Sequence, residues 1–221
     1  MKTELTFENV KNNPEIQTYL EFTDMAFAKM GYKEHGTNHA LYSAEVAEQI
    51  MKYLGYGQKE QEMAKIAAYL HDIGNVISKH QHDQNGAMMF LYLMRQNDFD
   101  EDAFTIASAI GCHEDKNSDP ISPIAAALVL GDKTDVRHER LRAEDMKALD
   151  KHSKVIAACR KVDVVVDKAN MTIGLWITID TNICSVMDYF EIFMARTIYC
   201  RRASRVLKCN FELYINKDKF L

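Results

Sequence analysis

The stretch AAYLHDIGN, residues 67–75, carries a histidine and an aspartate at the point where an apolar helical stripe ends. His71 is the next member of a stripe that recurs at helical spacing through Met63, Ile66, Ala67 and Leu70. Asp72 follows directly, and Gly74 is a typical helix-ending residue. An anion at the C-terminal end of a helix is unfavourable unless a cation compensates its charge. The doublet therefore predicts a charged position that needs a compensating cation.

Other polar residues fall on the inward stripes of the helices predicted around this stretch. They are His39 in helix 38–54, His82 at the start of helix 82–96, His113 at the end of helix 100–111 and Asp132 in helix 122–140. A lone ionised carboxylate in an apolar stripe, such as that of Asp132, costs several kcal/mol and normally protonates or finds a partner.

Each of these residues also has a simpler interpretation. A single inward histidine is most often a hydrogen-bonded core residue, and Asp132 could pair with the nearby Lys133 or Arg137. Together, however, four histidines and two aspartates on five successive helices, with no buried cation evident, match the ligand set of a divalent metal site. The sequence therefore favours a metal site over six unrelated core positions.

The rest of the chain predicts a mostly α-helical protein with a small C-terminal α+β annex. Its 221 residues suggest one main core and a small addition, and the low counts of Gly (9) and Pro (3) favour long helices. Beside the four helices above, apolar periodicity predicts helices over 14–30, 58–73 and 145–159. Helix 122–140 has the clearest start, because Ser122 can cap it and Pro123 suits its first position.

The pattern changes at about residue 160. Two β-branched runs, Val162–Asp167 and Met171–Ile179, flank a short polar turn and predict a hairpin. A helix over 183–207 and a strand over Phe211–Ile215 follow, which gives a helical domain of residues 1–159 and a ββαβ annex of residues 160–221. Because a small sheet has open edges, we expect the annex to pair with a second copy in a homodimer.

Composition excludes several classes of function. A net charge of −5 and a pI near 5.9 offer no basic surface for nucleic acid. The five cysteines are odd in number and form no CxxC pair, which is typical of a protein of the reducing cytoplasm. The N-terminus lacks the apolar core of a signal peptide, and the longest apolar run, Ile124–Leu130, is too short to span a membrane.

These residues resemble the HD-domain family of metal-dependent phosphohydrolases. The family pattern is H…HD…D, and His39, the doublet His71-Asp72 and Asp132 follow it in order and in helical context. The resemblance covers roughly residues 35–142 and leaves the annex outside the generic domain. It implies a metal-dependent hydrolase built on a helical bundle.

Two further histidines resemble those of the two-metal HD-GYP subgroup. His82 in HDQNG looks like its H-x-x-x-G element, and His113 in IGCHED looks like the second histidine of its HHE element. His80 could take the place of His82 but lacks the glycine four residues later. The chain departs from the subgroup, because Cys112 replaces the first histidine of HHE, Asn75 replaces the usual lysine of HDxGK and no GYP follows. These departures give no support to cyclic-dinucleotide specificity. They leave the ligand set of a two-metal site intact.

The resemblance implies a division of the ligands between two ions. Asp72 would bridge both, with His39, His71 and Asp132 on one ion and His82 and His113 on the other. Two cations about 3.5 to 4 Å apart can activate a hydroxide and stabilise phosphoryl oxygens. Nitrogen and oxygen ligands admit several metals, and this many histidines favours iron or manganese over zinc, cobalt or magnesium.

The predicted function is therefore hydrolysis of a phosphate ester of a nucleotide or another small molecule. Asp72 would be central to catalysis, and Lys133 and Arg137, expected on one helix, would bring positive charge to the rim as phosphate clamps or proton donors. Two alternatives stay open. One is a one-metal nucleotidase of the same superfamily, in which His82 and His113 contact substrate, and the other is a non-catalytic metal-dependent binding module.

Overall fold

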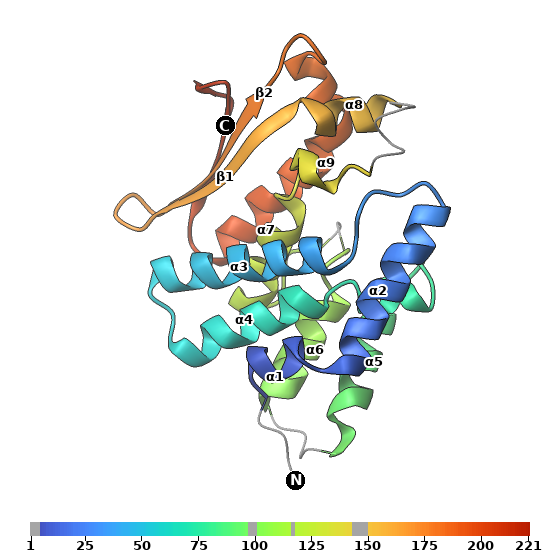
Figure 1. Cartoon of the computed structure of the whole chain (residues 1–221). Coiled ribbons are helices and arrows are strands. Elements are labelled where there is room, and N and C mark those ends of the chain that lie inside the picture. The colour runs from blue at the N-terminus through green and yellow to red at the C-terminus, as the bar shows by residue number, and fades with distance from the viewer. Residues whose placement is uncertain (1–4, 97–100, 116–117, 143–149) are drawn as a thin grey trace.

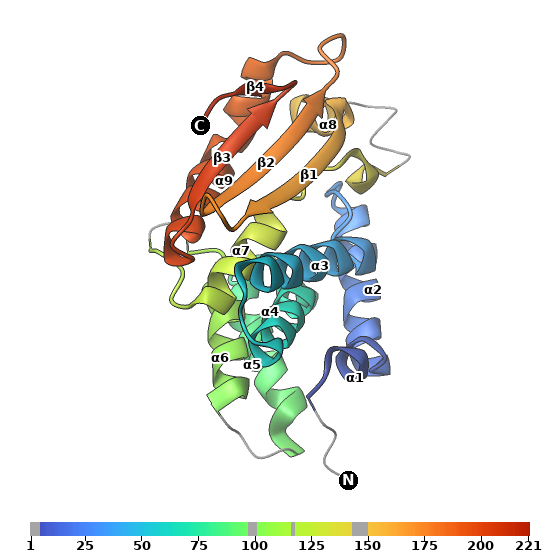
Figure 2. The same ribbon diagram turned by 90° about the vertical axis from the view of Figure 1, so that its left-hand side faces the viewer.

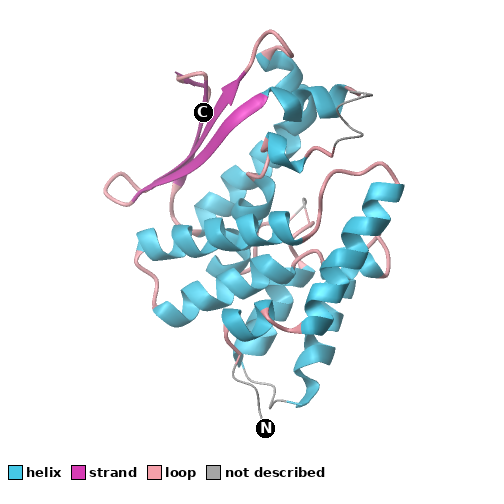
Figure 3. Cartoon of the chain, in the orientation of Figure 1, coloured by secondary structure: helices cyan, strands magenta, loops and turns pink. Residues whose placement is uncertain are grey.

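Helices build the part of the chain that precedes the sheet (Figures 1 and 3). The computed structural model describes residues 5–96, 101–115, 118–142 and 150–221. Its helices before the sheet are α1 (Phe7–Lys11), α2 (Pro14–Lys29), α3 (Thr37–Leu54), α4 (Gln58–Leu70), η1 (Ile73–Val76), α5 (His82–Leu93), η2 (Met94–Gln96), α6 (Glu101–Gly111), α7 (Pro123–Lys133), η3 (His138–Arg140) and α8 (Lys151–Ala158). The predicted mostly helical fold is confirmed, and the short helix α1 is an addition to it.

Local sequence signals set several helix ends. Asn13 caps α2 ahead of Pro14, and the Ser122 hydroxyl accepts a hydrogen bond from the Ala125 amide at 3.1 Å at the predicted start of α7. α3 ends at Gly55, whose φ of +89° is a left-handed conformation that favours glycine. α4 ends at Leu70, and the chain then continues through η1.

The predicted helix 122–140 is too long. α7 ends at Lys133, and both the backbone N–H and the hydroxyl of Thr134 donate to the Leu130 carbonyl, at 3.2 and 2.6 Å. Beyond it, the carboxylate of Asp135 is directed to His39 and Arg137, so the chain leaves the helical path. The predicted helix 145–159 is observed as α8 from Lys151, and residues 145–149 lie outside the described part.

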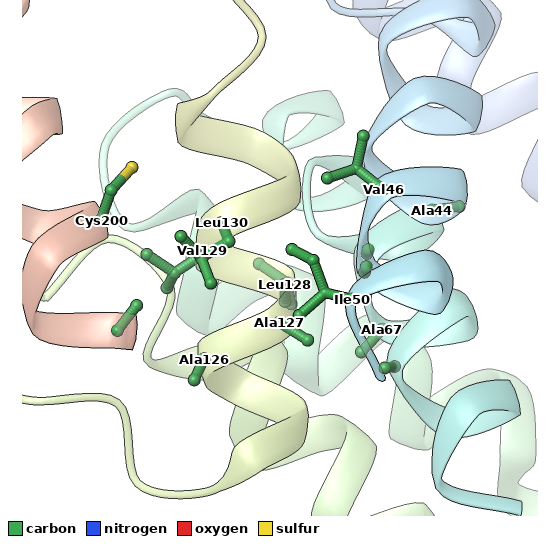
Figure 4. Close-up of a cluster of buried hydrophobic side chains, with 14 of the residues drawn as sticks. Ala44, Val46, Ile50, Ala67, Ala126, Ala127, Leu128, Val129, Leu130 and Cys200 are labelled. Atoms are coloured by element: carbon green, nitrogen blue, oxygen red, sulfur yellow. The ribbon is translucent and has the colours of Figure 1, made fainter. Parts of the chain in front are cut away.

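α7 occupies the centre of the molecule. Each of its residues from Ile124 to Lys133 is buried. Figure 4 shows α7 between α3, which presents Ile50, and the C-terminal helix α9 (Val186–Val206), which presents Cys200. A side chain on α7 is therefore surrounded by protein, and a charged group there needs partners within the fold.

The C-terminal part forms a four-stranded sheet that α9 covers on one face (Figure 2). The strands β1 (Cys159–Asp167), β2 (Thr172–Ile179), β3 (Asn210–Ile215) and β4 (Asp218–Lys219) lie in this order across it. The predicted hairpin is confirmed as the antiparallel pair β1–β2, and β3 runs parallel to β2 after the crossover through α9. Strand β4 was not predicted.

The sheet and the helices share one continuous set of buried apolar residues. The division at residue 159 stays a prediction. β1 is an edge strand of the sheet, and its pairing with a second copy of the chain also stays a prediction. Among the helices of the described residues, none combines the length and the apolar character that crossing a bilayer requires.

Candidate metal centre

The six residues that the sequence singles out as metal ligands come together in the structure. They form three overlapping groups, His39–His71–Asp72, His71–His113–Asp132 and Asp72–His82–His113, and the ligand atoms within each group lie within 4.8 Å of one another. All are buried except His82, which is partly exposed. We call these six residues the His/Asp cluster. The structure places His82 in this cluster, whereas His80 is exposed to solvent.

Asp72 lies at the centre of the His/Asp cluster. Its Oδ2 is 3.3 Å from His71 Nε2 and 3.8 Å from His39 Nε2, while its Oδ1 is 3.3 Å from His82 Nε2. The Asn75 amide donates a hydrogen bond to the same Oδ1 at 2.8 Å and holds the carboxylate in place. One oxygen of Asp72 thus faces each half of the cluster, as a bridging carboxylate requires.

Asp132 completes the half that contains His39. Its Oδ1 is 3.4 Å from His39 Nε2 and 3.8 Å from His71 Nε2. A Cβ on Gly131, the preceding residue, would lie 2.4 Å from the backbone oxygen of Ser43 on α3. The missing side chain lets α7 approach α3 closely, and this contact brings Asp132 to His39.

The far nitrogen of each histidine ring has a partner that fixes the ring. Nδ1 of His71 donates to the Ala68 carbonyl at 2.7 Å, and Nδ1 of His113 donates to the Ile110 carbonyl at 2.7 Å. These acceptors are last-turn carbonyls that a helix end leaves open. Nδ1 of His82 meets the Lys79 carbonyl at 3.1 Å, and Nδ1 of His39 meets Asp135 Oδ2 at 2.8 Å. All four Nε2 atoms are therefore left to face the cluster with their lone pairs.

The Nε2 atoms that point into the cluster are better placed to bind a metal ion than to form hydrogen bonds with one another. His71 Nε2 is buried and makes no hydrogen bond. The Nε2 atoms of His82 and His113 face each other at 3.1 Å, although Nδ1 of each ring already has an acceptor. Such unsatisfied, convergent lone pairs are costly in a buried site. A divalent cation would satisfy them together with the two carboxylates, so the donor set fits a metal centre.

The electrostatics of the cluster follow from burial and close carboxylates. Burial alone would lower the pKa of His71, but the charges of Asp72 and Asp132 raise it to about 9. Burial would raise the pKa of Asp72, yet the adjacent His71 holds it well below its ordinary value. His113 has a pKa of about 3, because burial and the positive charges of His71 and Lys133 disfavour its protonation. The two buried carboxylates thus stabilise positive charge at this point, and a divalent cation would take the place of the proton on His71.

We expect Asp135→Asn to weaken metal binding about tenfold or more, because a carboxylate on Nδ1 orients a histidine ligand and raises its basicity. Asp135 is buried and bonds both His39 and Arg137. Metal titration of the variant against Asp218→Asn, a change on the exposed strand β4, measures the effect. Equal metal affinity in the two variants would show that His39 does not depend on this bond.

A cleft of about 540 Å³ lies beside the His/Asp cluster. Its lining includes cluster residues (Asp72, His82 and Asp132), cations (Lys33, Lys79, Lys133 and Arg196) and aromatic or imidazole rings (Phe27, Tyr32, His35 and His152). A small anionic molecule in this cleft would therefore contact both the cluster and positively charged side chains.

Lys133 lines the cleft, as the sequence predicts, and is also tied to the cluster. Its ammonium lies 2.6 Å from Asp132 Oδ2 and donates to Glu114. Its side chain is only 4% exposed. Lys133 thus holds the oxygen of Asp132 that faces away from the histidines, and one of its three N–H donors is left for a ligand.

Arg137 does not have the expected position at the cleft rim. Because α7 ends at Lys133, Arg137 is not one turn further along the same helix. Its guanidinium bonds Asp135 at 2.7 and 3.1 Å and lies 3.7 Å from the centre of the Tyr42 ring. It faces a separate hollow formed by α3 and η3. Its contacts support Asp135, which in turn holds His39.

Sequence reasoning missed several cleft residues that lie far from the HD doublet. Arg196 is three residues after the buried Phe193 and four before the buried Cys200, so it lies on the inward stripe of α9. His152 similarly precedes the buried Val155 and Ile156 on α8. A polar residue in an apolar stripe is the signal that revealed Asp132, and applied to α8 and α9 it would have indicated both. Lys33 and Lys79 lie in loops, where no such pattern exists.

Comparison with known proteins agrees with this geometry. A family model described as HD domain matches residues 36–191, well over half of the chain. The chain is also similar to a Methanocaldococcus jannaschii protein named "Uncharacterized protein MJ1020", with 24% identity over an alignment of 183 positions that covers 72% of this chain and 71% of that protein. The expected resemblance is confirmed, and the match extends beyond residue 142 through β1 and β2 into α9. The chain belongs to the HD domain family, most of whose members are metal-dependent hydrolases.

Proposed function

We propose that the protein is a phosphohydrolase that uses two divalent metal ions to cleave a phosphate ester of a nucleotide or another small molecule. The observation that carries the proposal is the buried His/Asp cluster, in which Asp72 directs one oxygen to His39 and His71 and the other to His82. A pair of divalent cations lowers the pKa of water and stabilises charge on phosphoryl oxygens. Iron or manganese suits a set rich in imidazole.

The chain's own residues would hold the reacting groups. His39, His71 and Asp132 would bind one ion, His82 and His113 the other, and Asp72 both. Lys133 would keep Asp132 ionised and direct its remaining N–H toward a phosphoryl oxygen in the cleft. Asn75 would fix the bridging carboxylate through its bond to Asp72 Oδ1.

Hydrolysis assays on the metal-loaded protein test this proposal. The protein, reconstituted with Mn²⁺ or Fe²⁺, is expected to release phosphate from at least one member of a panel of nucleotides, sugar phosphates and aryl phosphates, and chelation should abolish the activity. Tight binding of a panel member without turnover would favour a non-catalytic binding module instead. If the protein neither binds nor cleaves any phosphate compound of the panel, the proposal is refuted.

The number of metals is tested by His82→Ala. Because His82 approaches only the half of the cluster that contains His113, we expect the variant to lose about one metal equivalent per chain and to keep the other. His80→Ala, two residues away and exposed, is the matched control. Elemental analysis measures the metal content. Unchanged metal content with weaker substrate binding would support the one-metal nucleotidase, in which His82 and His113 contact the substrate.

A further inference from the structure

Two cations that line the cleft have no carboxylate partner among the described residues. They are Lys79, in the loop before α5, and Arg196, on α9. The ammonium of Lys79 lies 3.5 Å from the centre of the Tyr32 ring, and the guanidinium of Arg196 lies 5.3 Å from the centre of the Phe193 ring. Arg196 is half-buried, so its guanidinium lies partly against protein and partly open to the cleft.

The acidic groups of the cleft are already engaged. Asp132 and Glu114 are bound to Lys133, and the carboxylate of Asp72 faces the histidines of the cluster. Asp150 caps α8 by accepting a hydrogen bond from the Ser153 amide at 2.6 Å. None of these carboxylates forms an ion pair with Arg196 among the described residues, so its guanidinium is open to an anionic ligand.

Arg196 is better suited than Lys79 to select a ligand. It is half-buried on a helix of 21 residues, whereas Lys79 is exposed in a loop. A guanidinium presents a planar fork of donors that matches phosphate or carboxylate in a bidentate way. His152 and Arg196 both contact the Phe193 ring, and burial and then the charge of Arg196 lower the pKa of the His152 imidazole. Arg196 is thus placed in the cleft by a long helix, beside an imidazole whose protonation is disfavoured.

Arg196 is not one of the side chains that hold the His/Asp cluster together. Lys133 contacts Asp132 directly, whereas Arg196 forms no ion pair with Asp72, Asp132 or any other carboxylate of the described residues. Arg196 also lies beyond residue 191, where the HD domain match ends. It is supplied by the middle of α9, which the HD domain match does not reach.

We propose that Arg196 binds a second anionic group of the substrate, so that the protein selects compounds that carry an anion in addition to the phosphate that is cleaved. This inference rests on the proposed phosphohydrolase function. The second group is a phosphate or a carboxylate, both of which fit the guanidinium fork. Arg196 is accordingly a specificity residue, and it takes no part in the cleavage of the first phosphate.

Binding of non-hydrolysable phosphonates tests the inference without a need for turnover. The probes are the alkane-1,n-diphosphonates with chains of three to six carbons and the alkyl monophosphonates of the same chain lengths. Calorimetry with the manganese-loaded protein is expected to show at least one diphosphonate that binds about tenfold tighter than its monophosphonate, a gain of about 1.4 kcal/mol. Arg196→Gln should remove this gain and leave monophosphonate binding unchanged.

Two further variants make the result specific. Arg201→Gln changes an exposed arginine on the same helix outside the cleft and should keep the full gain. Arg196→Lys keeps the charge but not the fork, and it should keep part of the gain. Circular dichroism and metal content check that each variant is folded and loaded.

The outcomes separate this inference from the proposed function. If monophosphonates bind in a metal-dependent way but no diphosphonate binds tighter, or if the gain survives in Arg196→Gln, the inference on Arg196 is wrong and the phosphohydrolase proposal stands. If no phosphonate binds and no phosphate ester is cleaved, the proposed function fails and the inference fails with it.

Discussion

Asp72→Ala should abolish the hydrolytic activity, with a fall in kcat/KM of about 10³-fold or more, because metal ions contribute several kcal/mol of transition-state stabilisation and each 1.36 kcal/mol is tenfold in rate. Asp72 is the residue whose two oxygens approach both halves of the His/Asp cluster. Its removal therefore weakens both candidate metal positions, whereas the loss of any single histidine weakens one.

Metal content and activity should fall together in this variant. Elemental analysis after gel filtration measures the first, and phosphate release from the best substrate of the panel measures the second. Asp83→Ala is the matched control, since Asp83 also adjoins a cluster histidine but belongs to none of the three ligand groups. If the Asp72→Ala variant kept two metal equivalents and full activity, Asp72 would not be a ligand that both metal ions need.

The sequence predicts the His/Asp cluster well, because its signal is local. A helix repeats every 3.6 residues, so the spacing of its apolar residues indicates which face is turned to the core. A polar residue on that face is easily recognised in the sequence. His39, His71 and Asp132 were found in this way and meet at the centre of the bundle. The resemblance to the family added the order of the motif and the division of the ligands between two ions.

The surroundings of the cluster are harder to predict, because they depend on where helices end and on how distant segments meet. The assumption that one helix runs to residue 140 placed Arg137 at the cleft rim. The actual end of α7 at Lys133 turns Asp135 toward His39 and Arg137 toward Asp135. A helix end shifts by a few residues at little cost, so periodicity alone does not fix it.

The cations of the cleft illustrate the second difficulty. Lys33 and Arg196 are 163 positions apart in the numbering and line the same cavity because α9 packs beside α7. The sequence predicts the annex as a separate unit that pairs with a second copy, so the inward position of Arg196 on its helix is not connected with the His/Asp cluster. Its order of strands, with β3 parallel to β2, follows from the long crossover through α9 rather than from any local pattern.

Gly74→Ala should disrupt the half of the cluster that contains His82 and lower the free energy of unfolding by about 1–3 kcal/mol, the usual cost of overpacking a tight core. A Cβ at residue 74 would lie 2.0 Å from the backbone oxygen of His82 and 2.4 Å from the backbone nitrogen of Gly86. These neighbours are backbone atoms, so they cannot rotate away as a side chain can. Only a shift of α5 away from η1 can make room.

That shift would carry His82 away from Asp72, since their 3.3 Å contact links the same two segments. Gly111→Ala is the matched control, because a Cβ there would meet only the side chain of Ala87 at 3.4 Å, an ordinary packing distance. Denaturant titration gives the change in stability, and elemental analysis gives the metal content. We expect Gly74→Ala to lose about one metal equivalent, as His82→Ala does, whereas Gly111→Ala loses none. If Gly74→Ala kept both its stability and its metal, η1 and α5 would not need their close approach, and the placement of His82 would have to come from α5 alone.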